Sequence, residues 1–199
     1  MNFRESIENT WEIESKTIAD LSKAVDKNKL EDLMNAVINC KGKIITSGCG
    51  TSGTAGMKIA HTLNCVECPS YFMSPAEALH GGLGTVSKED IVVLLSKGGR
   101  SEEIDSIMEC SSQKGAKVIG ITENEDCILA QKADIFIKIK VEREPDDFNM
   151  LATGSTLAAI ALFDAVAIAI TRIRGYDKED FLRIHPSGDV GKRLAGGRE

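Results

Sequence analysis

The chain has 199 residues, of which 42% are hydrophobic and 27% charged, and 24 Lys and Arg stand against 30 Asp and Glu for a formal net charge of -6. This composition is that of a globular protein and excludes a disordered or fibrous chain. A chain of this length can bury roughly 70% of its extended surface, so one domain without a disulfide or metal staple is expected. The acidic balance argues against nucleic acid as a partner.

Neither the N-terminus nor the longest apolar run of the sequence indicates a membrane protein. The first residues are acidic and have no apolar core, which predicts no signal peptide and a cytoplasmic location. The longest apolar run, residues 157–170, is short for a bilayer span and contains Asp164, so a buried helix is expected there. Cys65 and Cys68 have the spacing of a metal or redox pair, but without a second pair they are interpreted as structural. No membrane partner and no metal are expected.

Hydrophobic periodicity divides the chain into alternating elements. Two amphipathic helices are predicted within residues 1–40. Short β-branched runs and crossover helices then alternate; the predicted strands are residues 44–46, 70–73, 91–96, 118–122 and 135–141, and the predicted helices are residues 53–63, 101–113 and 127–132. A long apolar helix follows over residues 155–172, closed by Gly175, and an exposed-looking tail begins at residue 176, with a last short helix after Ser187.

This order predicts an α/β fold, a three-layer αβα sandwich around a five-stranded parallel sheet. We expect a single domain over residues 1–199, made of N-terminal helices (1–40), the αβα core (41–175) and a tail (176–199) that contributes to the site. The apolar helices offer more apolar surface than one sheet needs. A homo-oligomer is therefore expected.

Three loops combine glycines with hydroxyl side chains at predicted helix starts, over residues 47–54, 96–103 and 153–156. In an open parallel sheet, ligands bind at the carboxyl ends of the strands. Glycine lets the backbone approach an anion, and the free amides and dipole of a helix start favour negative charge. Three such loops predict one phosphate site, although Ser and Thr also cap helices without any ligand.

The first loop also fits a dinucleotide fingerprint, because Gly48, Gly50 and Gly53 follow a predicted strand. A nicotinamide site should offer an acid near the end of the second strand. No acid occurs there before Glu77. A dinucleotide-dependent enzyme is therefore the less favoured alternative, and no cofactor is expected.

Residues 48–53, 96–103 and 185–194 resemble a sugar isomerase (SIS) domain, and residues 74–84 resemble the arabinose 5-phosphate isomerases in particular. The resemblance covers about residues 43–194. It implies a doubly wound, flavodoxin-like sheet and a tetramer or dimer. Within the class, the chain resembles the single-domain members, which lack the C-terminal CBS pair.

The resemblance also implies two groups of site residues. The first group holds the phosphate and gives it backbone room: Gly50, Thr51, Ser52, Ser96, Gly99 and Ser101. The second group surrounds the sugar: His80, Glu103, Glu144 and His185. Thr51 stands where the isomerases usually have Lys, and Gly98 stands where Ser is usual. Lys97 or Arg100 of the second loop could supply the missing positive charge.

Interconversion of a ketose phosphate and an aldose phosphate moves a proton between adjacent carbons through a cis-enediol. The phosphate orients the substrate, and a positioned His or Glu transfers the proton. We assign His185 or Glu144 to the proton shuttle, and His80 with Glu103 to ring opening and hydroxyl binding. Simpler readings exist for each: a turn residue for His80, an exposed tail for His185, helix-dipole stabilisation for Glu103 and a solvated loop for Glu144.

The leading hypothesis is therefore a sugar-phosphate aldose-ketose isomerase that interconverts D-ribulose 5-phosphate and D-arabinose 5-phosphate. His185 would complete the site if the tail reaches the pocket of a neighbouring subunit. An isomerase for another ketose phosphate is a related alternative. A non-catalytic sugar-phosphate sensor is an alternative from another class, and Thr51 in place of Lys motivates it.

Overall fold

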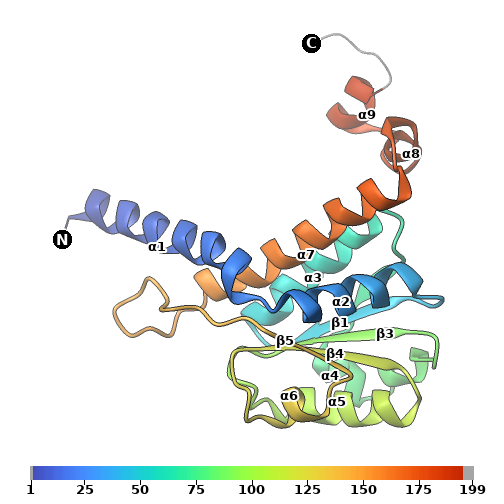
Figure 1. Cartoon of the computed structure of the whole chain (residues 1–199), viewed down its shortest axis with the longest axis horizontal. Helices are drawn as coiled ribbons and strands as arrows, with labels where there is room; N and C mark the ends of the chain where they lie inside the picture. The colour runs from blue at the N-terminus through green and yellow to red at the C-terminus, as the bar shows by residue number, and fades with distance from the viewer. Residues whose placement is uncertain (1, 195–199) are drawn as a thin grey trace.

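The structure is a computed structural model that describes residues 2–194. Five parallel strands form one sheet in the order β2-β1-β3-β4-β5 (Figure 1). The strands are β1 (Ile44–Gly48), β2 (Ser70–Phe72), β3 (Ile91–Leu95), β4 (Lys117–Thr122) and β5 (Ile135–Lys138). This order is doubly wound and flavodoxin-like, so the predicted fold class is confirmed.

The last strand is shorter than predicted. It ends at Lys138 rather than at Val141, because its neighbour β4 ends at Thr122 and has no further residue with which β5 could pair. The final bond runs from the Ile139 amide to the Thr122 carbonyl over 3.1 Å. Ile139 and Val141 are still buried, which explains their strand-like hydrophobicity in the sequence.

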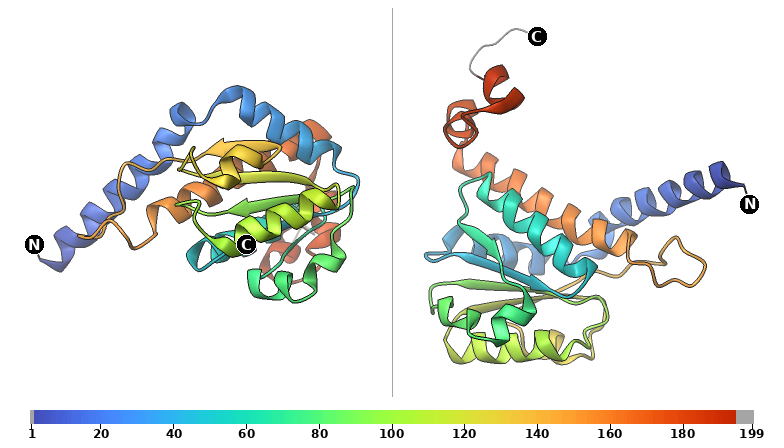
Figure 2. Two further views of the ribbon diagram at one scale, coloured as in Figure 1. Left: turned by 90° about the horizontal axis from the view of Figure 1, so that it is seen from below. Right: turned by 180° about the vertical axis from the view of Figure 1, so that it is seen from behind.

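Helices cover both faces of the sheet, as predicted (Figures 1 and 2). One face carries α2 (Lys27–Asn39), α3 (Thr51–Asn64) and α7 (Gly154–Arg174). The other carries α4 (Pro75–Leu79), the 3-10 turn η1 (Gly82–Thr85), α5 (Glu102–Gln113) and α6 (Ile128–Lys132). Side chains alternate along β3, so that Val93 and Leu95 pack under α3 and α7 while Val92 and Leu94 pack under α5.

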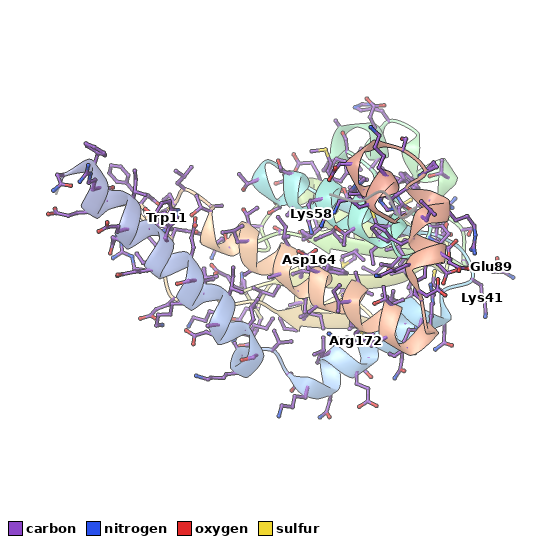
Figure 3. The ribbon with its side chains drawn as sticks, turned by 90° about the horizontal axis from the view of Figure 1, so that it is seen from above. Trp11, Lys41, Lys58, Glu89, Asp164 and Arg172 are labelled. Atoms are coloured by element: carbon purple, nitrogen blue, oxygen red, sulfur yellow. The ribbon has the colours of Figure 1, made fainter. Side chains whose placement is uncertain are left out.

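α7 is the central helix of the first face. It has 21 residues and is long and apolar enough to cross a membrane by length and composition, so the expectation that this segment is too short for a span is wrong. Within a single chain 39% of its most apolar stretch is buried. α3 and α1 (Phe3–Ala24) pack on it, and Asp164 forms an ion pair with Lys58 of α3 (Figure 3). α7 thus packs against the other helices of this face and shares one hydrophobic core with the sheet.

The tail is more ordered than predicted. α8 (Lys178–Ile184) and α9 (Gly188–Leu194) follow α7, whose end at Gly175, with a φ of 63°, is as expected. α9 is the predicted last short helix. α8 was not predicted, although Asp177 and Asp180 form a capping box that signals its start. Residues 195–199 of the predicted tail lie outside the described residues.

Candidate active site

The first two predicted loops meet at the carboxyl edge of the sheet. β1 and β3 are neighbours, with Gly48 opposite Leu95. The strand order reverses at this pair, because β2 lies on one side and β4 on the other. Doubly wound sheets bind their ligands at such a switch point.

The starts of α3 and α5 are not capped by side chains. The N-cap of α3 is Gly50, whose φ of 57° and ψ of -129° suit glycine, and Ser101 makes no capping bond at α5. Instead, the Ser101 and Ser96 hydroxyls lie 3.2 Å apart. Both helix starts therefore keep backbone amides that can donate to an anion, which favours ligand binding over helix capping for these serines.

A pocket lies between the starts of α3 and α7 above the sheet. Its polar wall includes Ser52, Ser96, Lys97, Ser155 and Thr156. The space that water-sized groups can occupy within it is about 30 Å³, enough for one or two such groups. A phosphorylated sugar can place only part of its anionic end inside, so its carbon chain would lie at the open mouth.

Glu144 is buried at the start of α7, not solvated. Its side chain is 0% exposed. The carboxylate accepts bonds from the Lys97 ammonium (2.8 Å) and from the Thr153 (3.1 Å) and Ser155 (3.3 Å) amides. Burial alone would raise the pKa of Glu144, but the bonds from Lys97, Ser155 and Thr153 outweigh it and hold the pKa below its ordinary value of 4.5. The carboxylate therefore occupies the third predicted anion site as a fixed charge.

We expect Glu144→Gln to lower the free energy of unfolding at neutral pH by about 1.5–3 kcal/mol, because it weakens bonds to a charged group. A carboxyl whose pKa is depressed on folding stabilises the protein above its unfolded pKa, and this contribution disappears as the pH falls through the folded pKa. The free energies of unfolding of the wild type and the variant, measured with urea, should therefore converge as the pH falls below about 4.5. A stability difference between the two proteins that stays constant down to strongly acidic pH would contradict the assignment of Glu144 as a fixed charge.

The structure distinguishes between the two cations of the second loop. Both Lys97 and Arg100 line a neighbouring groove. Only Lys97 also lines the pocket, where it binds Glu144, whereas Arg100 is exposed. Thr51, at the first position of α3, is also exposed.

Glu103 lies near the first loop. It is exposed in the first turn of α5, and its charge acts on the Cys49 thiol. Burial and then Glu103 raise the pKa of that thiol, while a hydrogen bond from Ser101 opposes them. Sequence reasoning did not include Cys49 in the site, although it sits between two of the loop glycines.

The two candidate histidines are not joined to the loops within one chain. His80 is exposed at the C-terminal end of α4, and its ring makes no hydrogen bond within residues 2–194. The His185 ring stacks on Phe181 and lies 3.6 Å from the Cys65 thiol, just beyond the far end of α3. A contribution of His185 to the pocket therefore requires another subunit.

The second loop depends on a glycine at position 99. Gly99 has a φ of 64°, and a Cβ added there would lie 2.3 Å from the Cys127 sulfur. We expect Gly99→Ala to lower the free energy of unfolding by on the order of 2–3 kcal/mol. Gly98→Ala, whose added Cβ meets nothing within 4 Å, should change it by less than about 0.5 kcal/mol. If chemical denaturation shows equal losses of stability for the two variants, the loop does not depend on glycine at position 99.

The fold and the loop geometry are those of α/β proteins that hold an anionic small molecule at the carboxyl edge of a parallel sheet. More specifically, the chain belongs to the SIS domain family, whose profile matches residues 37–169. The resemblance predicted from the sequence is confirmed.

Three relatives show how far this similarity extends. Arabinose 5-phosphate isomerase KpsF of Escherichia coli is 37% identical over 95% of this chain, which spans 60% of the length of KpsF. A crystal structure of a candidate sugar-phosphate isomerase from Listeria monocytogenes matches with a TM-score of 0.91 and 43% identity, covering 94% of this chain and 100% of that one. An E. coli CFT073 protein in complex with arabinose 5-phosphate matches with a TM-score of 0.88 and 28% identity over 94% of this chain and 100% of its own.

Proposed function

We propose that this protein is a sugar-phosphate aldose-ketose isomerase that interconverts D-ribulose 5-phosphate and D-arabinose 5-phosphate in the cytoplasm. The observation that carries the proposal is the pair of uncapped helix starts at the switch point, with Ser52, Ser96 and Ser101 around them. The chain is similar to KpsF over 95% of its own residues and 60% of the length of KpsF. The arabinose 5-phosphate bound to the E. coli CFT073 protein supports a phosphosugar as the ligand.

In this proposal the phosphate binds the two uncapped helix starts, with Gly50 and Gly99 shaping the backbone around it. The binding energy of this unreactive end orients the sugar carbons. A base removes a proton from C1 of the ketose, the C2 oxygen is protonated to give the cis-enediol, and the C1 hydroxyl proton is lost as C2 is protonated. The product is the aldose, and no redox partner is needed.

The environment of the candidate bases favours His185 as the proton carrier. Imidazole exchanges protons near neutral pH, whereas the lowered pKa of Glu144 and its three bonded donors make it a weak base. Glu144 then serves as a fixed anion behind Lys97, which lines the pocket. Glu103, near the first loop, and His80 remain the groups proposed for ring opening and hydroxyl binding.

The proposal includes a homo-oligomer. Phe3 and Trp11 of α1 are 75% and 65% exposed, and Phe148 and Met150 in the loop before α7 are 82% and 80% exposed. α1 and this loop extend past the sheet on the same side of the molecule (Figures 1 and 2), and Trp11 lies on the extended part of α1 (Figure 3). Large apolar side chains gathered on projecting segments are typical of a surface that a partner covers.

Turnover of D-ribulose 5-phosphate, compared with other pentose and hexose phosphates, separates the isomerase from its alternatives. We expect arabinose 5-phosphate to be the preferred product. An isomerase for another ketose phosphate would instead turn over a different member of the panel. A sensor would show thermal stabilisation by phosphosugars without any turnover, and that result would contradict the proposal.

A further inference from the structure

Lys97 is fixed in place at the end of the third strand. Its carbonyl accepts bonds from the Thr122 hydroxyl (2.9 Å) and the Glu123 amide (3.1 Å), both at the end of β4. Lys97 lies two residues beyond the end of β3 at Leu95, and it lines the pocket together with Leu95, Ser96 and Ser52. The two bonds to its carbonyl therefore fix the backbone from which the Lys97 side chain reaches the pocket.

The Lys97 ammonium is held at the pocket wall but is not enclosed there. Its nitrogen lies 2.8 Å from Glu144 Oε1, and its side chain is 29% exposed while that of Glu144 is 0% exposed. Among the described residues that line this pocket, Lys97 is the only Lys or Arg. An ammonium has three donors, so one bond to Glu144 leaves donors available for a ligand.

Fold stability is a weak explanation for this ion pair. Buried ion pairs contribute little net stability compared with apolar side chains of similar size, because desolvation offsets their attraction. The Glu144 carboxylate already has the Thr153 and Ser155 amides at a helix start. Thr51 meanwhile brings no charge to the first loop, so a dianion in this pocket would otherwise meet no cation.

We propose that Lys97 supplies the positive charge that binds the phosphate of the substrate, with Glu144 holding its ammonium toward Ser52 and Ser96. The cation of this site is thus carried by the second loop instead of the first. The inference rests on the proposed function for the identity of the substrate, but the phosphate contact itself does not depend on turnover.

The experiment compares Glu144→Gln with the double variant Lys97→Met/Glu144→Gln, because removal of Lys97 alone would leave the buried Glu144 carboxylate without its counter-ion and so destabilise the fold. Binding of inorganic phosphate and of D-arabinose 5-phosphate is measured by calorimetry. The matched control is Lys138→Met/Glu144→Gln, since Lys138 pairs with Glu125 at the same edge of the sheet without lining this pocket.

We expect the double variant to bind both probes roughly 10- to 100-fold more weakly than Glu144→Gln, as for the loss of a charge-assisted hydrogen bond. The Lys138 control should bind within about twofold of Glu144→Gln. A folded double variant that binds inorganic phosphate as tightly as Glu144→Gln would overturn the inference. A wild type that binds phosphosugars but never isomerises them would contradict the proposed function and leave the role of Lys97 standing.

Discussion

Replacement of His185 by Ala is expected to reduce turnover of ribulose 5-phosphate by roughly 10²- to 10⁴-fold, the usual range for loss of a positioned acid-base group. Binding of the phosphosugar should change far less, because the proposed phosphate site lies at the two helix starts and not at His185. His61→Ala is the matched control, since the His61 ring also lies beside Cys65, at 3.8 Å. It should keep nearly full turnover.

The position of His185 makes this prediction sharper. α3 has 14 residues, and at a rise of 1.5 Å per residue its two ends are about 20 Å apart. Ser52 lies at one end and Cys65, next to His185, just beyond the other. His185 therefore acts on the pocket of a second subunit if it acts at all.

Mixing inactive variants tests this arrangement. His185→Ala and Ser52→Ala/Ser96→Ala should each be nearly inactive alone at low substrate. Subunits exchanged between the two should regain activity, because a mixed pair contains one site with an intact phosphate loop and an intact histidine. If both variants fold and exchange subunits, a mixture that stays inactive excludes a shared site.

The double variant Ser52→Ala/Ser96→Ala is expected to weaken phosphosugar binding by about 100-fold or more. Each hydroxyl hydrogen bond to a charged group contributes about 1.5–3 kcal/mol, and both side chains line the pocket. The loss should raise KM more than it lowers kcat, since the phosphate interacts similarly in the ground and transition states.

Ser112→Ala is the control for the double variant, because Ser112 is exposed at the opposite end of α5 from Ser101. It should leave both KM and kcat unchanged. If the double variant keeps a normal KM and loses only kcat, the two serines act in the chemical step and not on the phosphate.

The sequence alone predicts the fold because its signals are local. The β-branched runs and the glycine after Arg174 report directly on strand positions and on the end of α7. The first two predicted loops, residues 47–54 and 96–103, are predictable for the same reason, since each lies at the end of its strand. The sheet order then brings the first two together.

The remaining features depend on long-range contacts. Glu144 and Lys97 are 47 residues apart, and only the packing of the loop before α7 shows that a carboxylate in a charge-rich segment is buried. His185 and Cys65 are 120 residues apart, so the direction of the tail is not encoded in any local pattern. The choice of Lys97 over Arg100 also depends on the long-range contact with Glu144, because both cations lie in the loop beyond the end of β3.

Proton transfer at the sugar carbons is the central claim, and isotope exchange measures it directly. The protein is incubated with D-ribulose 5-phosphate in D₂O, and the products are followed by NMR. The account predicts arabinose 5-phosphate that carries deuterium at C2. Neither product nor exchange across a panel of pentose and hexose phosphates, from a protein that binds them, would contradict it.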